Sequence, residues 1–133
     1  MSARIEGRVK EILNGRDVAH VAIPRADGSV QSVIVWADEE GGLIALNSAV
    51  GRAWPANLRR AGRATVTMMA GGNSNEWVSI EGRLEDATTL GAREHIDALA
   101  AKYGHGEFRL RSATERRIKL TLRPERIYYL KQD

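Results

Sequence analysis

The sequence lacks cysteine altogether and contains few aromatic residues. The absence of cysteine among the 133 residues excludes a disulfide framework, an iron–sulfur cluster and a cysteine nucleophile. Because aromatic residues make up only 5%, we expect a core of valine, isoleucine, leucine and alanine. No stretch approaches the roughly 18 consecutive apolar residues of a membrane span, and the charged N-terminal segment has no signal-peptide-like apolar region. We therefore expect a cytoplasmic protein with no membrane partner.

Recognised catalytic motifs are also missing. The sequence contains no Gly-x-Ser-x-Gly, no Walker sequence and no Gly-x-Gly-x-x-Gly. The histidines are His20, His95 and His105, and because no pair has metal-ligand spacing, we expect structural roles for them and no metal site. The residues alone identify no catalytic group. This pattern fits either an enzyme whose chemistry belongs to a bound cofactor or a protein that is not an enzyme.

Positive charge is abundant and unevenly placed. Sixteen of the 20 basic residues are arginine, and the net charge is +3. Residues 41–75 contain no acidic side chain, whereas residues 109–126 carry seven basic side chains and two acidic ones. Arginine forks match phosphate and carboxylate geometry, so one interpretation is an anion site, and the other is a solvated surface. With one phenylalanine, base-stacking platforms are scarce, so we do not expect a nucleic-acid partner.

Hydrophobic periodicity predicts a single domain over residues 1–133 with more strands than helices. The expected strands cover residues 18–23, 30–36, 43–46, 64–69, 77–84, 118–122 and 126–130, and the expected helices cover residues 3–14, 51–60 and 88–103. The first strand is largely apolar, so we expect both of its faces to be buried. About seven antiparallel strands with few free edges favour a mainly β fold, a small barrel with short helices.

Turn and breaker residues predict how these elements are joined. Asp27-Gly28 and residues 39–42 would form two tight turns that link the first three strands into an antiparallel meander. Gly82, inside a predicted strand, indicates a bulge or a close approach of another backbone. Thr88 or Thr89 would cap the last helix, whereas Pro124 would separate the last two strands.

The segment from residue 46 to residue 60 could bind an anion. A predicted strand ends in Asn47-Ser48, Gly51 and Arg52 follow, and Pro55 suits the start of a helix. An amide, a hydroxyl, a guanidinium and the N–H groups of a helix start can form a cradle for phosphate. An ordinary strand-to-helix turn with capping residues would show the same pattern.

Several segments together resemble the pyridoxamine 5′-phosphate oxidase-like split β-barrels, particularly the branch that uses the deazaflavin coenzyme F420. These segments are residues 27–36, 46–48 with 51–52 and 57–60, 77–83 and 122–128. They occur in the family's order and spacing over nearly the whole chain. The resemblance implies an FMN-binding-like split barrel and a homodimer with two cofactor sites at the subunit interface.

The resemblance also implies a set of cofactor-binding residues. They are Ser32, Val33, Ile34, Val35, Trp36, Asn47, Ser48, Arg52, Trp54, Asn57 and Trp77. The strand from Ser32 to Trp36 would lie against the flavin-type ring, largely through backbone groups. Asn47, Ser48 and Arg52 would face the cofactor phosphate, and Trp77 would approach the ring from the partner subunit.

The sequence departs from the family pattern at Trp54. The family usually carries a basic residue, most often lysine, four positions before the helix leucine, which here is Leu58. An indole cannot neutralise a phosphate, although it can cover a ring or close a pocket. The alternative is that Trp54 packs beneath the helix.

The implied activity is that of a coenzyme F420-dependent oxidoreductase. Reduced F420 would pass a hydride to an electron-poor small molecule such as an enone, a quinone or a tetrapyrrole. One alternative is an FMN-dependent oxidase or reductase of the same fold, and another is a non-catalytic barrel that binds a flavin or a tetrapyrrole. No catalytic residue is identified at this stage.

Overall fold

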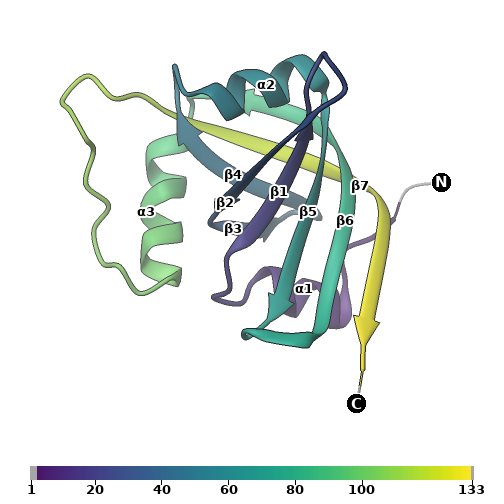
Figure 1. The fold of residues 1–133 in the computed structure, drawn as a ribbon. Helices are drawn as coiled ribbons and strands as arrows, with labels where there is room; N and C mark the ends of the chain where they lie inside the picture. Colours follow the sequence, from purple (N-terminus) through teal and green to yellow (C-terminus); the bar gives the residue numbers. More distant parts are fainter. Residues whose placement is uncertain (1–2, 133) are drawn as a thin grey trace.

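The computed structural model describes residues 3–132 (Figure 1), which form seven strands and three helices. The helices are α1 (Gly7–Leu13), α2 (Ala53–Ala61) and α3 (Ala92–Lys102). The strands are β1 (Ala19–Pro24), β2 (Val30–Val35), β3 (Ala37–Glu40), β4 (Leu43–Ala49), β5 (Arg63–Ala70), β6 (Asn73–Thr88) and β7 (Arg117–Lys131). The predicted mainly β architecture with short helices is therefore confirmed.

All seven strands belong to one antiparallel sheet in the order β2-β1-β5-β6-β7-β4-β3. The long strands β6 and β7 pair along almost their whole length and form the middle of the sheet. Figure 1 shows the sheet strongly curled, with α3 lying outside it on one side, α2 across one end and α1 near the other end.

The two edge strands of this sheet are consecutive in the chain. Only Trp36 separates β2, which pairs with β1, from β3, which pairs with β4. Because one segment supplies both the first and the last strand, the sheet must curl until its two ends meet. Beyond Leu46, β4 has no β3 partner, and before Trp36, β2 has a neighbour only on the β1 side. This arrangement leaves a gap between the free edge of β2 and the far end of β4.

The interior of the barrel is filled mainly by aliphatic side chains, as the scarcity of aromatic residues predicts. Among the largest fully buried side chains are those of Leu46, Leu58, Met68, Ile80 and Leu120. Trp54 also belongs to this core cluster and is only 8% exposed. The core thus extends beneath α2, which anchors the helix across the end of the barrel.

Two predictions about the first strands are wrong. The first three predicted strands do not form a meander, because the third of them, β4, pairs with β3 and β7 rather than with β2. Strand β1 is not buried on both faces, since His20 is exposed between the buried Ala19 and Val21. In a curled sheet only the inner face of a strand is covered, so alternation returns even in an apolar run.

Of two expected breaks in the strands, one is shorter than predicted and the other is absent. Glu39 and Glu40 lie in β3, and the turn is made by Gly41 and Gly42 with φ angles of 59° and 87°. Pro124 does not end a strand, because it faces Gly82 at a shift in the β6–β7 register. Proline lacks the N–H of a regular ladder and is tolerated at such a bulge. The last two predicted strands therefore form one strand, β7.

The expectation for Gly82 is confirmed. A Cβ atom at this position would lie 3.0 Å from the Cβ of Leu122 and 3.3 Å from the carbonyl oxygen of Arg123, so the close approach requires glycine. The prediction that Thr88 or Thr89 caps α3 is wrong. The N-cap of α3 is Gly91, with a φ of 74°. Leu90, placed on the buried side of this helix by its spacing, is 84% exposed.

Candidate functional site

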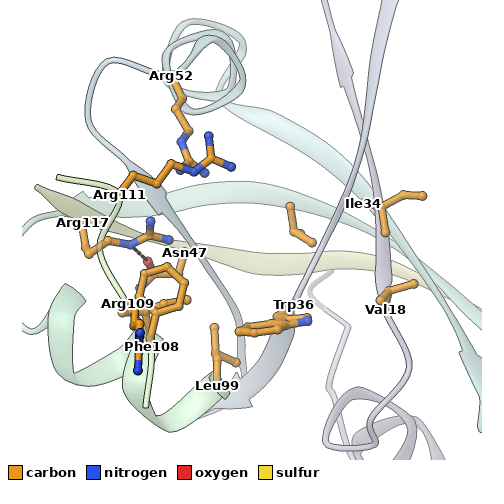
Figure 2. Close-up of a pocket in the computed structure, with 12 residues that line it drawn as sticks. Val18, Ile34, Trp36, Asn47, Arg52, Leu99, Phe108, Arg109, Arg111 and Arg117 are labelled. Atoms are coloured by element: carbon orange, nitrogen blue, oxygen red, sulfur yellow. Dashed lines mark hydrogen bonds between the residues drawn. The ribbon is translucent and has the colours of Figure 1, made fainter. Parts of the chain in front are cut away.

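A pocket of about 330 Å³ lies beside the gap in the barrel (Figure 2). We call it the arginine pocket. Its lining residues are Val18, Ile34, Val35, Trp36, Asn47, Arg52, Ile96, Leu99, Phe108, Arg109, Arg111 and Arg117. They come from β2, β4, α3, the start of α2, the segment between α3 and β7, and the first residue of β7. The volume is at the lower end of the range for small-molecule sites.

One wall of the arginine pocket is the free edge of the sheet. Val33 and Val35 of β2 pack toward the core, whereas Ile34 is 64% exposed. Alternate backbone N–H and C=O groups of an edge strand point away from its only neighbour. This wall therefore offers both apolar side chains and unpaired backbone groups to a flat ligand.

Aromatic groups from the end of α3 hold Trp36 in place. The indole stacks on the Tyr103 ring with centroids 5.1 Å apart and planes at 13°, and His105 contacts its ring at 4.9 Å. The Tyr103 hydroxyl donates to the carbonyl oxygen of Asp17 at 2.7 Å and accepts from the N–H of Ala37 at 3.2 Å. These contacts fix the junction between the two edge strands against α3.

The opposite part of the arginine pocket is strongly cationic. Arg52 at the start of α2 and Arg109, Arg111 and Arg117 all line it, and Figure 2 shows Arg52 and Arg111 extending toward the same region. Glu115 lies 3.1 Å from Arg117 and 3.7 Å from Arg52, and no other carboxylate among residues 3–132 is within ion-pair distance of these four arginines. The positive charge therefore exceeds the negative charge that the described chain supplies.

Arg117 is held more firmly than the other three arginines. Its Nε donates to Oδ1 of Asn47 at 3.0 Å, its Nη1 donates to Glu115 at 3.1 Å, and its guanidinium lies 4.7 Å from the centre of the Phe108 ring. Its side chain is only 5% exposed. Burial lowers the pKa of Arg117, while the hydrogen bond to Glu115 raises it.

A buried polar chain continues from Asn47 toward the outer face of the sheet. Nδ2 of Asn47 donates to the carbonyl oxygen of Ala92 at 2.9 Å and lies 3.0 Å from Nδ1 of His95. Nε2 of His95 lies 2.9 Å from a carboxylate oxygen of Asp38 in β3. The histidine therefore connects the arginine pocket to a carboxylate on a different strand.

A second hollow of about 470 Å³ adjoins the arginine pocket. Its lining includes Arg52, Arg111 and Arg116, the backbone near Gly51, the hydroxyl-bearing Ser112 and Thr114, and one acidic residue, Glu115. Because Arg52 and Arg111 line both spaces, the two form one continuous cationic surface. The N-cap residue of α2, Arg52, makes no side-chain capping hydrogen bond.

The structure gathers only some of the residues that the family resemblance implies. Ile34, Val35, Trp36, Asn47 and Arg52 line the same pocket, and their contact with a cofactor remains a prediction.

Other implied residues lie elsewhere in the chain. Ser32 and Val33 are on β2 but do not line the arginine pocket, and Ser48 is buried with no partner for its hydroxyl among residues 3–132. Nδ2 of Asn57 donates to the side chain of Gln31 at 3.2 Å. Trp77 packs against another aromatic ring on β7, and its approach to a partner's ring remains a prediction.

Trp54 is the clearest difference from the implied site. Its side chain points into the core under α2 rather than into the arginine pocket, so the packing alternative describes it. Trp54, the second residue of α2, packs in the core, whereas Arg52, just before the helix, lines the pocket.

The sequence interpretation missed part of the site. Phe108, Arg109, Arg111 and Arg117 were not singled out, although the density of basic residues in 109–126 was a signal for an anion site. The segment carrying the first three has no periodicity, so its path could not be inferred. The role of His95 could not be inferred either, because its partners lie 48 and 57 positions away.

Comparison with known proteins identifies the fold. No protein-family model matches the sequence, and no curated protein matches it. Among solved structures, an F420 reductase aligns over 90% of this chain and 94% of its own, with a TM-score of 0.79 and 18% identity. A candidate pyridoxamine 5′-phosphate oxidase from Listeria innocua aligns over 94% and 97%, with a TM-score of 0.70 and 16% identity.

A third similar structure is an FAD- and heme-binding protein from Mycobacterium smegmatis. It aligns over 100% of this chain and 73% of its own, with a TM-score of 0.72 and 18% identity. These likenesses confirm the split β-barrel fold that the sequence resemblance implied. None of the helices formed by residues 3–132 combines the length and hydrophobicity needed to span a bilayer.

Proposed function

We propose that this protein is an oxidoreductase that binds coenzyme F420 and supports hydride transfer to an electron-poor small molecule. The observation that carries the proposal is the arginine pocket, in which four arginines lie beside an exposed strand edge and only two of them, Arg52 and Arg117, pair with a carboxylate of residues 3–132. The neighbours in fold include an F420 reductase, which supports the same class of cofactor. FMN is the alternative cofactor.

The residues present fit an anionic flavin-type cofactor. Four guanidinium groups with a single carboxylate repel one another, and an anion with two or more negative charges would relieve this repulsion. The edge of β2 supplies an apolar and hydrogen-bonding wall for a ring, at Ile34, Val35 and Trp36. Phosphate and ring would therefore bind at opposite sides of the same pocket.

The adjoining second hollow supports F420 over FMN. FMN carries one phosphate, whereas F420 carries a phosphodiester followed by a tail with several carboxylates. The cationic surface continues past Arg52 and Arg111 to Arg116 and the Ser112 and Thr114 hydroxyls. This length of positive surface exceeds the need of a single phosphate and suits a chain of anionic groups.

The chain's own contribution is binding, orientation and exclusion of water. A bound deazaflavin supplies two-electron hydride chemistry that no protein side chain can provide. Among the residues that line the arginine pocket, none is an aspartate, glutamate, histidine, lysine or tyrosine. The lining thus holds no proton donor suited to neutral pH, so the substrate proton would come from solvent. Arg52 and Arg111 hold the anionic part, and Ile34 and Trp36 cover the ring.

We also infer that the protein is a homodimer. Val30 is 58% and Ile34 is 64% exposed on the free edge strand β2, so one wall of the arginine pocket is open in a single chain. A second copy would cover these apolar side chains and complete the site. The solution mass measured by light scattering tests this inference, and a monomer at micromolar concentration would contradict it.

Titration of the purified protein with F420 and with FMN tests the proposed function. Trp36 lines the pocket, so we expect its fluorescence to be quenched on binding, and we expect F420 to bind at least about tenfold more tightly because its tail adds charge-assisted contacts. In the Trp36→Phe variant the quenching should largely disappear. The Trp77→Phe variant measures how much of the quenching comes from Trp77, which the family resemblance places near the ring from the partner subunit. Absence of binding by both cofactors would reject the proposal, and tighter binding of FMN would favour the alternative.

A further inference from the structure

The hydrogen-bond pattern fixes the amide of Asn47 in one orientation. The guanidinium of Arg117 can only donate, so the atom that faces its Nε must be Oδ1. The carbonyl oxygen of Ala92 can only accept, so the atom that faces it must be Nδ2. These two partners lie on opposite sides of the amide, and Asn47 is buried with 6% exposure. The amide therefore cannot flip without losing both contacts.

The orientation of Asn47 determines the state of His95. Nδ2 of Asn47 faces Nδ1 of His95 at 3.0 Å, and because Nδ2 donates, Nδ1 must accept. The ring proton then resides on Nε2, which donates to Asp38 at 2.9 Å. His95 is thus a neutral imidazole whose two nitrogens have different partners. Asp38 holds the ring so that Nδ1 stays directed at Asn47.

The same chain of contacts determines where Arg117 points. Nε is used by Asn47 and Nη1 by Glu115, whereas Nη2 makes no hydrogen bond with any of residues 3–132. Since Arg117 lines the arginine pocket, Nη2 is the part of the guanidinium left for a ligand. A shift of Asn47 would move the guanidinium as a rigid plane and misplace Nη2.

We propose that His95 and Asp38 are positioning residues that act through Asn47 to aim Arg117 at the anionic group of the ligand. The proposal rests on the proposed function in taking that group to be the phosphate of a flavin-type cofactor. The network links side chains of β3, α3, β4 and β7 in one chain of contacts from Asp38 to Arg117. A histidine that only filled space would not need two nitrogens engaged in opposite roles.

The test compares F420 with the deazaflavin alcohol that lacks both its phosphodiester and the carboxylate tail attached to it. The affinity of F420 and that of the deazaflavin alcohol lacking its phosphate are measured in the wild-type protein, His95→Leu and His95→Asn. In His95→Leu we expect about a tenfold loss for F420, the effect of one charge-assisted hydrogen bond, and little change for the alcohol. His95→Asn should retain most of the affinity, because its amide oxygen can replace Nδ1 as acceptor for Asn47.

A double-mutant cycle shows whether His95 acts through Arg117. If it does, His95→Leu should cause no additional loss of F420 affinity in the Arg117→Gln protein. Additive losses would overturn the proposal, and so would equal losses for F420 and the phosphate-free alcohol. Where His95→Leu does not fold, Asp38→Ala replaces it, because Asp38 is partly exposed, and a smaller loss confined to F420 is expected.

Failure of the proposed function can be told apart from failure of this inference. If the wild-type protein binds neither F420 nor FMN, the proposed function is rejected, and the same variants are examined with pyrophosphate by thermal unfolding. A rise in Tm with pyrophosphate that is lost in Arg117→Gln and in His95→Leu supports the positioning role. A rise that His95→Leu leaves intact overturns it.

Discussion

Arginine is used in opposite ways in two regions of the molecule. Near α1, Arg8 forms a bidentate pair with Glu76 at 2.7 and 2.9 Å, and the Tyr129 hydroxyl donates to the same carboxylate at 2.6 Å. In the arginine pocket, Glu115 pairs with Arg52 and Arg117, and Arg109 and Arg111 have no carboxylate of residues 3–132 within ion-pair distance. The first region matches each charge within the chain, whereas the second leaves positive charge unmatched.

The pKa shifts follow the same contrast. Glu76 raises the pKa of Arg8, and Arg8 together with Tyr129 lowers the pKa of Glu76 to about 2. At the pocket, burial lowers the pKa of Arg117 despite its contact with Glu115. A charge that is fully paired within the chain stabilises the folded state, because both partners belong to the same protein. A charge that is buried without enough partners is stabilised only when a ligand supplies them.

The largest expected effect concerns Trp54, the position where related barrels carry a basic residue. If Trp54 belongs to the core, Trp54→Lys should lower the free energy of unfolding by about 3–5 kcal/mol, as for other large-to-small changes of buried aromatics. It should not tighten F420 binding. Urea unfolding and fluorescence titration measure the two quantities. A stable variant with higher affinity would place this residue at the pocket and weaken the contrast drawn above.

Removal of one pocket arginine should affect binding more than folding. We expect Arg52→Ala to weaken F420 binding by about 1.5–3 kcal/mol, the range for hydrogen bonds to charged groups. Arg63→Ala is the matched control, because Arg63 is exposed on β5 and does not line the pocket. Both affinities are measured by titration at one salt concentration. Equal losses of affinity in the two variants would mean that F420 responds to the overall positive charge of the protein and not to Arg52 in the pocket.

The paired region should show the reverse, an effect on folding alone. The pKa of Glu76 is about 2 in the folded protein and ordinarily 4.5, so the folded state binds this proton less tightly than the unfolded chain. Its stabilisation is therefore complete above pH 4.5 and is lost as the pH falls toward 2.

Urea unfolding of the wild-type protein and Glu76→Gln measures that effect. The difference in stability should be constant near neutral pH and should vanish toward pH 2, with cofactor affinity unchanged throughout. A difference that persists at pH 2, or a change in affinity, would contradict the assignment of Glu76 to folding.

The smallest expected effect is that of removing the charge of Glu115, and it distinguishes the arginine pocket most sharply from the paired region around Glu76. Glu115→Gln removes the carboxylate that, among residues 3–132, pairs with the pocket arginines, and it keeps an oxygen for Arg117. We expect F420 to bind about threefold more tightly, because the substitution removes a negative charge that repels the anionic part of the ligand. A weaker affinity would mean that Glu115 serves chiefly to hold Arg117 in place.

The sequence was sufficient to predict the elements that depend on local patterns. Hydrophobic periodicity predicted the strands, and Gly82 marked a close approach that the structure contains. Strand pairing was less predictable, because the register that joins β4 to β7 spans about half the chain. Pro124 was misread because its tolerance depends on Gly82, a residue on another strand.

Prediction of the site succeeded where a residue's position follows from its element. Ile34 and Trp36 lie on an edge strand, and Arg52 lies just before a helix, so their places in the pocket follow from the fold that the resemblance implied. The direction of Trp54 depends on how α2 rolls against the barrel, which is decided by long-range packing. The path of Arg109 and Arg111 depends on an irregular segment, for which no periodic signal exists.

The single residue between β2 and β3 restricts how the length of the chain can change. Val33, Val35 and Ala37 all face the core, so side-chain alternation passes through Trp36 without interruption. One inserted or deleted residue there would turn every side chain of β3 to the opposite face and shift its register against β4. Loops elsewhere can absorb such changes. Trp36 alone fixes the register of the β2–β1 pairing relative to that of the β3–β4 pairing. The junction therefore tolerates substitution of its side chain but no change of its length.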